Sequence, residues 1–321
     1  MTHLARRFAA LAVFCMLSAA ALAQEPGQWT QRAELLAPNS EFAVAELNGR
    51  LYILGGYPAS RVTVRTVQIY NIAADRWEPG LDLPQPNNHG MAASVNGKVY
   101  LIGGQTEASG DTYVDTVYEF DPAAGKWMEK SKMPTRRSAG VALVRDGLIY
   151  VAGGRPPHGH DFAVYDPAAD RWEKLPDLPS QRNHIAGAVI DGRIHVIGGR
   201  LGGGFRSEQS AAHEVFDPES RNWSVAAPML RPRSGINGAL ANGCLHAWGG
   251  ESAAGVFSDH DYYDPRSDKW TKLAHMPLPV HGVTGAAFVN GLIHAPGGGT
   301  EMGGSSGSLH NQVYRPVVSC Q

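Results

Sequence analysis

The sequence has few cysteines, little net charge and no long apolar run outside its first residues. It contains 3 cysteines among 321 residues and no Cys-x-x-Cys pair, which excludes a thiolate metal or redox motif. A formal net charge of -2 excludes the strong positive charge of many nucleic-acid-binding domains. No segment beyond residue 23 is apolar over the length needed to cross a bilayer. We therefore expect no nucleic-acid partner and no membrane span.

The first 23 residues have the three parts of a secretory signal peptide. Arg6 and Arg7 supply the positive region, residues 8–22 the apolar region, and residues 21–23 the small-residue cleavage site. We predict that the mature chain begins at Gln24, which shifts the net charge from -2 to -4. The expected location is therefore periplasmic or secreted. The alternative is an N-terminal membrane anchor.

Export would leave two cysteines, Cys244 and Cys320, in a compartment where a disulfide can form. Two thiols do not make a disulfide-dependent scaffold. The residues leave open whether these two cysteines pair.

The chain lacks helical periodicity of useful length and shows a repeat instead. A Gly pair closes a short apolar run six times, at residues 55–56, 103–104, 153–154, 198–199, 249–250 and 297–298. An Asn-Gly or Asp-Gly dipeptide precedes each pair, at residues 48–49, 96–97, 146–147, 191–192, 242–243 and 290–291. This dipeptide between apolar runs predicts a β-hairpin, because both of its residues tolerate positive φ.

Each Gly pair is followed by a variable stretch, a strand that ends in an aromatic residue, and then a Trp that opens another strand. The unit is therefore four short antiparallel strands. Its period, measured between the first glycines of successive pairs, is 45 to 51 residues. This period is typical of a β-propeller blade. The fold class is thus all-β, with residues 24–321 forming a single six-bladed domain.

The two ends of the chain complete one another in this scheme. Trp29 lies at the spacing expected for the Trp of a repeat, but the three strands that should precede it are missing. The last unit has the opposite deficit, since it ends at Gln321 without a Trp. We therefore predict that the N-terminal strand joins the last blade and closes the ring, which removes two exposed sheet edges.

The Gly pair, the aromatic residue before Asp-Pro (as at Asp166-Pro167) and the spaced Trp resemble the kelch repeat. The resemblance covers essentially the whole mature chain. It implies that each unit is one blade, with its first strand nearest the central axis and its fourth strand outermost.

The variable stretches after the Gly pairs should share one rim of the propeller, opposite the short turns. These loops are residues 57–65, 105–114, 155–161, 200–212, 251–259 and 299–310. A rigid scaffold with variable loops at one end is the usual layout of a binding face.

Three sets of residues fall near the mouth of the axial channel on that rim. Ten residues before each turn glycine stand Asn39, Asn87, Arg137, Arg182, Arg233 and His281. Two residues later stand Glu41, His89, Ala139, His184, Gly235 and Val283. Directly after the Gly pairs stand Tyr57, Gln105, Arg155, Arg200, Glu251 and Gly299.

Clustered guanidinium groups suit the bidentate binding of carboxylate or phosphate. We therefore expect a monomeric binding module for an anionic small molecule or an acidic protein loop. The expected ligand-binding residues are Arg137, Arg155, Arg182, Arg200, Arg233, His281, Asn87, His89, His184 and Glu41. The structural alternative is that arginines near the first strand hydrogen-bond the loops of a neighbouring blade.

The alternative function is a sugar-processing enzyme. Exported bacterial kelch propellers include sialic acid mutarotases, which are similar to this chain in blade count and in an acidic residue after a Gly pair. Glu251 matches that position, but residues 252–260 lack the arginine that those enzymes use in the same loop. Glu251 and Arg233 are therefore the candidate catalytic residues of a mutarotase or epimerase.

No metal or other cofactor is expected. Galactose oxidase has a similar propeller, but Cys244 and Cys320 are poorly placed for its cross-linked Cys–Tyr copper site. The alternating ligands of His158-Gly159-His160-Asp161 lie in the shortest loop, where solvated side chains explain them better than a metal. Residues 303–307 have the spacing of a nucleophile elbow without its strand–turn–helix context.

Overall fold

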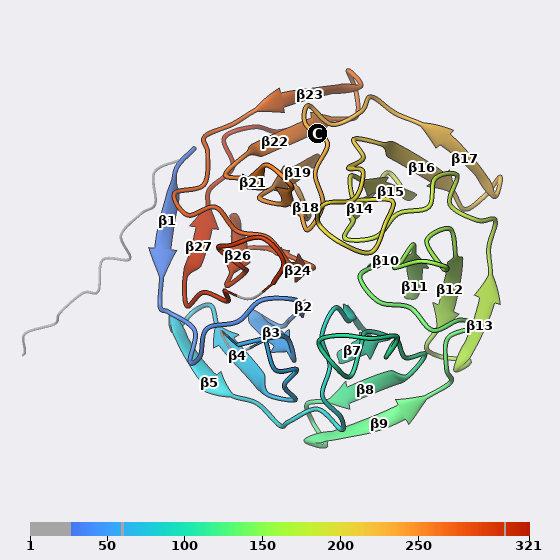
Figure 1. Cartoon of the computed structure of the whole chain (residues 1–321), viewed down its shortest axis with the longest axis vertical. Helices are drawn as coiled ribbons and strands as arrows, with labels where there is room; N and C mark the ends of the chain where they lie inside the picture. Colours follow the sequence, from blue (N-terminus) through green and yellow to red (C-terminus); the bar gives the residue numbers. More distant parts are fainter. Residues whose placement is uncertain (1–26, 59–60, 305) are drawn as a thin grey trace, which may run out of the picture.

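Six antiparallel sheets are arranged in a ring about a central axis (Figure 1). The structure is a computed structural model that describes residues 27–58, 61–304 and 306–321, so the expected signal peptide lies outside the described residues. Strands account for the regular structure of these residues, which confirms the all-β, six-bladed propeller. No helix in the described part of the chain has the length and apolarity that a membrane span requires.

Blades one to three each run outward through four consecutive strands. In blade one these are β2 (Phe42–Leu47), β3 (Arg50–Leu54), β4 (Val67–Asn71) and β5 (Arg76–Pro79). In blade two they are β6 (Met91–Val95), β7 (Lys98–Ile102), β8 (Val117–Asp121) and β9 (Lys126–Lys130). In blade three they are β10 (Val141–Arg145), β11 (Leu148–Ala152), β12 (Phe162–Asp166) and β13 (Arg171–Lys174).

Blades four and five keep this order. Blade four consists of β14 (Ala186–Ile190), β15 (Arg193–Ile197), β16 (His213–Asp217) and β17 (Asn222–Val225). Blade five consists of β18 (Asn237–Ala241), β19 (Cys244–Trp248), β22 (His260–Asp264) and β23 (Lys269–Lys272). A small hairpin of β20 (Glu251–Ser252) and β21 (Gly255–Val256) rises from its variable loop.

Blade six contains strands from both ends of the chain. Its sheet has the order β1-β27-β26-β25, with β1 (Trp29–Arg32) antiparallel to β27 (Asn311–Tyr314). The inner strands are β26 (Leu292–Pro296) and β25 (Ala287–Val289). The short β24 (Val283–Thr284) instead pairs in parallel with β2 of blade one. Trp29 lies opposite Tyr314, so the first Trp of the chain occupies the outer strand of the last blade.

The Trp that opens each outer strand joins its blade to the preceding one. Each indole Nε1 donates a hydrogen bond to a main-chain carbonyl of the neighbouring blade, over 2.8 to 3.2 Å. The donor–acceptor pairs are Trp29–Ala274, Trp77–Ala33, Trp127–Leu81, Trp172–Ser131, Trp223–Pro176 and Trp270–Ala227. The repeated Trp is therefore an element of blade-to-blade contact around the whole ring.

The apolar core is divided among the interfaces between blades. One cluster, for example, combines Leu54 and Ile69 of blade one with Leu101 and Phe120 of blade two. Another combines Trp29 and Tyr314 of blade six with Trp248 of blade five. Because each blade packs on two neighbours, closing the ring buries an apolar face that an open array would expose.

The Gly pairs mark the end of the second strand in every blade. Gly103 and Gly104 both have positive φ, at 60° and 103°. A Cβ on Gly103 would lie 2.4 Å from the carbonyl oxygen of Arg137, so no side chain fits between these adjacent blades. The pair is therefore required by blade packing.

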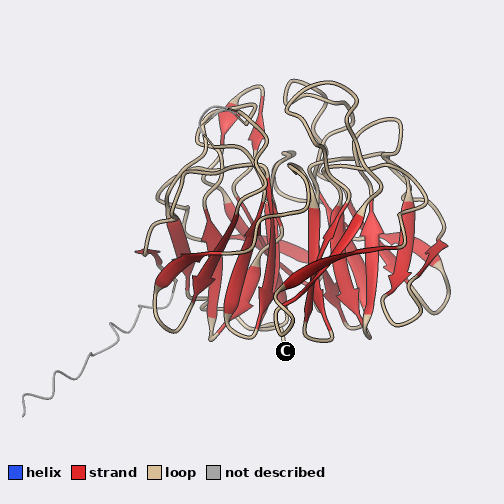
Figure 2. Cartoon of the chain, turned by 90° about the horizontal axis from the view of Figure 1, so that it is seen from below, coloured by secondary structure: helices blue, strands red, loops and turns tan. Residues whose placement is uncertain are grey.

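The long loops lie on one face of the ring and the short turns on the other, as Figure 2 shows in side view. Cys244 and Cys320 form a disulfide on the turn face, where the amide of Cys320 also bonds to the carbonyl of Asn242. The pairing that the sequence left open is thus present, and it fastens the C-terminal segment to blade five.

Candidate functional site

A ring of six main-chain hydrogen bonds links the blades around the axis beneath the loop face. It is formed by the second of the three residue sets near the axis, the set that includes Glu41, His89 and His184. Most members of this set have positive φ. The amide–carbonyl pairs are Glu41–Gly282, His89–Glu41, Ala139–His89, His184–Ala139, Gly235–His184 and Gly282–Gly235. Each blade thus donates to the preceding one, and the ring positions the side chains of Glu41, His89 and His184.

The ring corrects the expected alignment of blade six by one residue. Gly282, and not Val283, is its ring member. The amide of Gly250 donates to the carbonyl of Val280, and in the preceding blade the amide of Gly199 donates to the carbonyl of Arg233. Val280 is thus the residue equivalent to Arg233. His281 is therefore equivalent to Ser234 and not to Arg233. The extra residue explains why blade six has a longer spacing between Trp270 and its Gly pair than the other blades.

The first residue set, which begins with Asn39, forms hydrogen bonds within its own blades. Each of its first five members donates a side-chain hydrogen bond to the carbonyl of the first Gly in its own blade's pair. The pairs are Asn39–Gly55, Asn87–Gly103, Arg137–Gly153, Arg182–Gly198 and Arg233–Gly249. These bonds occupy three arginines that were expected to bind ligand, and they stay within each blade, whereas the structural alternative expected bonds to the loops of a neighbouring blade.

The contacts of these three arginines account for their burial. Arg137 also donates to the carbonyls of Val151 and Asp161, at 3.1 and 2.8 Å. Arg182 forms an ion pair with Glu214 at 2.6 Å, and Arg233 one with Asp261 at 3.0 Å. All three guanidinium groups are fully buried, and none of the three arginines lines the cavity described next.

The other two residue sets meet in a polar cavity of about 310 Å³ on the loop face. Its lining includes Glu41 and His89 from the ring. From the positions after the Gly pairs it includes Tyr57, Gln105, Arg155, Arg200 and Glu251. Five of the residues expected to bind ligand or to catalyse line this cavity, namely Glu41, His89, Arg155, Arg200 and Glu251. Six others do not line it: Asn87, Arg137, Arg182, His184, Arg233 and His281. Arg61, Tyr113 and Phe205 also line it from the variable loops, where no repeat position singled them out.

A second cavity, of about 330 Å³, runs along the inner strands. Its lining is aliphatic and small, with residues such as Val141, Ala186 and Leu240, and contains no charged side chain. It offers no group for acid–base chemistry or for ionic recognition. A third cavity, of about 360 Å³, is lined by Arg137, His158, Asp161 and Lys174, but by no residue of the ring or of the positions after the Gly pairs. The polar cavity combines members of both sets and is therefore the candidate functional site.

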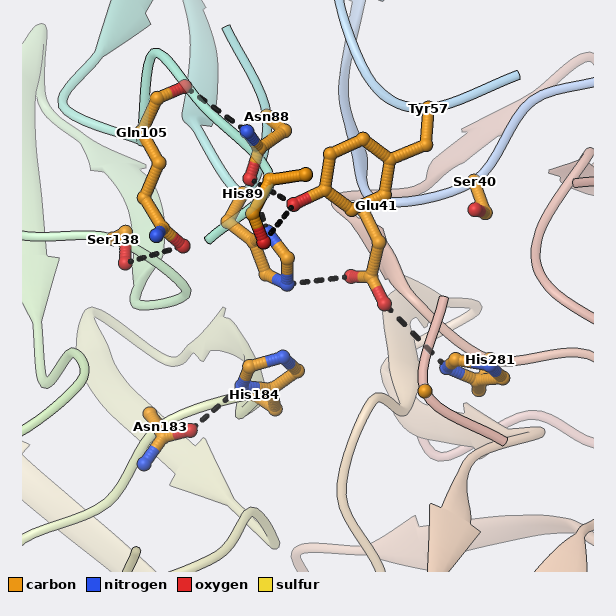
Figure 3. Close-up of polar contacts among 12 residues, drawn as sticks. Ser40, Glu41, Tyr57, Asn88, His89, Gln105, Ser138, Asn183, His184 and His281 are labelled. Carbon is orange, nitrogen blue, oxygen red and sulfur yellow. Dashed lines mark hydrogen bonds and ion pairs between the residues drawn. The ribbon is translucent and has the colours of Figure 1, made fainter. Parts of the chain in front are cut away.

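His89 is held between an amide and a carboxylate (Figure 3). Its Nδ1 lies 2.5 Å from Oδ1 of Asn88, and its Nε2 lies 3.0 Å from Glu41. Asn88 is oriented because its Nδ2 donates to Thr63 and to the carbonyls of Gln105 and Glu107. The amide oxygen is thus left as an acceptor, so Nδ1 of His89 carries the proton that it shares with Asn88.

His184 repeats this arrangement in blade four. Its Nδ1 lies 2.7 Å from Oδ1 of Asn183, whose Nδ2 donates to the carbonyls of Arg200 and Gly202. Its Nε2 lies 2.8 Å from Nη2 of Arg200. Arginine is always a donor, so Nε2 of His184 is an acceptor and the ring is neutral. Asn88 and Asn183 were not singled out from the sequence, although both precede a selected histidine.

The two arginines of the cavity differ in their partners. Arg200 is 3% exposed and forms an ion pair with Glu251 at 2.7 Å. Arg155 donates to the carbonyl of Gly203, and its Nη2 lies 3.1 Å from Nε2 of His89. Among the described residues, no carboxylate lies within ion-pair distance of Arg155, and its Nε has no hydrogen-bond partner. Arg155 is thus a cation without an ionic partner.

Burial and charge shift the pKa values of these groups. Burial acts to raise the pKa of Glu41, but His89, His281 and Arg200 outweigh it and lower that pKa, so the carboxylate is ionised. Burial lowers the pKa of His89 against the opposing effect of Glu41. Burial also lowers the pKa of Arg155, with Arg200 adding to the shift and Glu41 opposing it.

Glu41, His89 and His184 place one ligand atom each within 4.8 Å of one another, which is a donor set of the kind that holds metal ions. However, Nε2 of His89 and Nε2 of His184 each face a guanidinium group. A metal ion would have to displace both cations. The arrangement therefore fits the binding of an anion better than the binding of a cation.

Taken together, the fold and the site define a six-bladed β-propeller with a charged cavity at the axis of its loop face. The sequence model of the KLHDC2/KLHL20/DRC7 Kelch-repeats domain matches residues 25–199, and that of the Kelch motif matches residues 181–230. The first match covers more than half of the chain. The protein therefore belongs to the kelch-repeat family.

The curated relatives share one short segment with this chain. Kelch-like protein 36 of Mus musculus is 47% identical over 68 residues, as is that of Rattus norvegicus, and that of Bos taurus is 43% identical. These matches cover 21% of this chain and 11% of each relative. Among solved structures, that of YjhT superposes with a TM-score of 0.74 at 17% identity, over 88% of this chain and 96% of YjhT. This likeness shows the fold alone.

Proposed function

We propose that this propeller binds a small organic anion, of the size and polarity of a carboxylated monosaccharide, in the polar cavity of the loop face. The observation that carries the proposal is Arg155, a guanidinium group that lines the cavity and has no carboxylate partner among the described residues. A carboxylate can accept two hydrogen bonds from one edge of a guanidinium group. Tyr57, Gln105 and Tyr113 would surround the rest of the ligand.

The second candidate function is isomerisation of an acidic sugar, as in a mutarotase or epimerase. The observation that favours it is the buried Glu41–His89 pair, which opens into the cavity and can exchange a proton at Nε2. Glu251 and Arg233, the residues expected to be catalytic, are less suited to this role. Glu251 is paired with Arg200 and accepts from the amide of Gly303, and Arg233 lies outside the cavity.

A calorimetric titration with N-acetylneuraminate and galacturonate, beside galactose as the neutral sugar, tests the binding proposal. We expect the acids alone to bind, and Arg155→Met to reduce their affinity at least tenfold. Arg76→Met, on the exposed edge of β5, is the matched control. Binding of galactose at equal strength, or an unaffected Arg155→Met variant, would contradict the proposal. An acidic peptide in the same titration tests the alternative ligand, a protein loop.

The same samples decide between binding and catalysis. Exchange between sugar anomers can be followed by NMR with and without the protein. We expect accelerated exchange only if the second function holds, with loss of the acceleration in Glu41→Gln.

Export to an oxidising compartment is part of the proposal. The predicted signal peptide motivates it, and the Cys244–Cys320 disulfide supports it, because such bonds persist in oxidising compartments. Fractionation of cells that express the full chain would test it.

A further inference from the structure

Nε2 of His89 has two neighbours that require opposite protonation states. Arg155, through Nη2 at 3.1 Å, can only donate and therefore requires a lone pair on Nε2. Glu41 at 3.0 Å is a carboxylate and therefore requires a proton there. Because Nδ1 is committed to Asn88, the ring cannot satisfy both by changing tautomer.

His184 supplies the comparison, since its ring centroid lies 4.9 Å from that of His89. Its Nδ1 has the same kind of partner, Asn183, and its Nε2 the same kind of donor, Arg200. No carboxylate of the described residues forms an ion pair with His184. Its Nε2 is therefore an acceptor only, and the conflict belongs to His89 alone.

The charged and titratable groups around His89 come from five segments of the chain. They are Glu41 before β2, Tyr57 after β3, Arg155 after β11, His184 before β14 and Arg200 after β15. Arg200 is shared with Glu251, whereas Arg155 contacts His89 directly and is attracted by Glu41. Glu41 is 4% exposed, and His281 and Arg200 also stabilise its charge, so loss of the charge of Arg155 would weaken the compensation of a buried carboxylate.

An anion bound to Arg155 would weaken this compensation. Nη1 of Arg155 is occupied by the carbonyl of Gly203, whereas its Nε is unpartnered. The edge available for a bidentate contact therefore consists of Nε and Nη2, and Nη2 is the atom that contacts His89. A carboxylate on this edge competes with Nε2 of His89 for the same donor.

We propose that Nε2 of His89 is a proton-binding site that fills when an anion engages Arg155. One proton from solvent binds to Nε2 and is donated to Glu41, while the carboxylate of the ligand takes over Nη2 of Arg155. The charge of the ligand and the charge of the proton cancel, so the buried cavity keeps its net charge. Because the complex holds more protons than the free protein, affinity for the anion rises as the pH falls.

A first experiment needs no ligand. Arg155→Met removes the donor that keeps Nε2 deprotonated, so we expect the pKa of His89 to rise by about one unit. The imidazole ¹⁵N signals of the full chain, assigned with His89→Gln, report this value, and the signal of His184 in the same spectra is the internal control. An unchanged pKa of His89 in both Arg155→Met and Arg155→Gln would overturn the proposal.

The second experiment rests on the proposed function. Calorimetric titration with galacturonate at pH 7, in buffers that differ in ionisation enthalpy, measures proton uptake. We expect a net uptake that approaches one proton per bound anion and is lost in His89→Gln. Binding without proton uptake would overturn this inference and leave the proposed function standing. An absence of binding would overturn the proposed function, whereas the ligand-free experiment would still decide on the proton site.

Discussion

Five buried or partly buried arginines of this propeller have two different roles, and the position within the repeat decides which. Arg137, Arg182 and Arg233 precede the ring residues and donate to main-chain carbonyls of their own blade. Arg155 and Arg200 follow a Gly pair and line the polar cavity. Residue type does not separate these roles, because all five residues are arginines. What differs is the position in the repeat, before the ring residues or after the Gly pair.

Substitution of Arg182 tests the structural role. Arg182→Met leaves Glu214 buried without its ionic partner, and we expect the free energy of unfolding to fall by about 3–5 kcal/mol. Urea denaturation measures this change, with Arg76→Met on β5 as the exposed control. A variant of Arg182 with full stability and lost anion binding would assign this residue to the site instead.

Members of two of the three residue sets near the axis could be predicted from repeat spacing as cavity residues, since Glu41, Tyr57 and Arg155 line the cavity, whereas His184 and Gly299 of the same sets do not. The role of the first set could not be predicted, because asparagine and arginine reach the same glycine carbonyl by different lengths of side chain. Asn88 and Asn183 were missed for a related reason. Their function is to fix a tautomer, and the only sequence signal is an Asn-His dipeptide in two blades.

At the scale of elements, blade six departs most from the repeat. Four of the other five blades take all their strands from one continuous segment, whereas blade six takes β1 from the start of the chain. Its one extra residue lies between Gly282 and the Gly pair, and β24 pairs with blade one. The spacing of Trp and Gly predicted six blades, but only the structure shows that blade one also contains a strand from the sixth repeat.

Trp29 should therefore hold blade six together more than its equivalents hold theirs. Trp29→Ala removes a bond to Ala274 and a ring packed against Tyr314, and we expect a loss of about 3–5 kcal/mol. Hydrogen exchange in β27 should also accelerate, because β1 loses its main apolar anchor. Trp172→Ala in β13 is the matched control, since that strand continues directly from β12. Equal protection of β27 in both variants would contradict this assignment.

At the scale of the whole molecule, the two halves of the ring differ in what they bury in the second strand of each blade. Blades one to three place Tyr52, Tyr100 and Tyr150 at the middle of this strand. Blades four to six place a histidine at the same point, at His195, His246 and His294. The half of the ring that contains the chain closure therefore contains buried groups that can become charged.

These histidines should make the propeller sensitive to mild acid. Burial lowers the pKa of His195 to about 3, and those of His213, His246 and His294 to about 4. The unfolded chain has a histidine pKa near 6.5, so between about pH 6.5 and 4 it binds more protons than the folded state. Stability is therefore full above pH 6.5 and falls as the pH drops, by roughly 1.4 kcal/mol per pH unit for each such histidine.

His294 is the most direct test of this pH dependence, because it is 1% exposed and no other side chain of the described residues forms a hydrogen bond with its ring; the contact that acts on its charge is with the backbone of Val289. We expect His294→Phe to reduce the loss of unfolding free energy between pH 7 and pH 5, measured by urea denaturation at both values. Carboxylates with lowered pKa values, such as Glu41, are protonated only at lower pH and do not contribute in this window. An identical pH dependence in the variant and the natural chain would show that the acid sensitivity arises elsewhere.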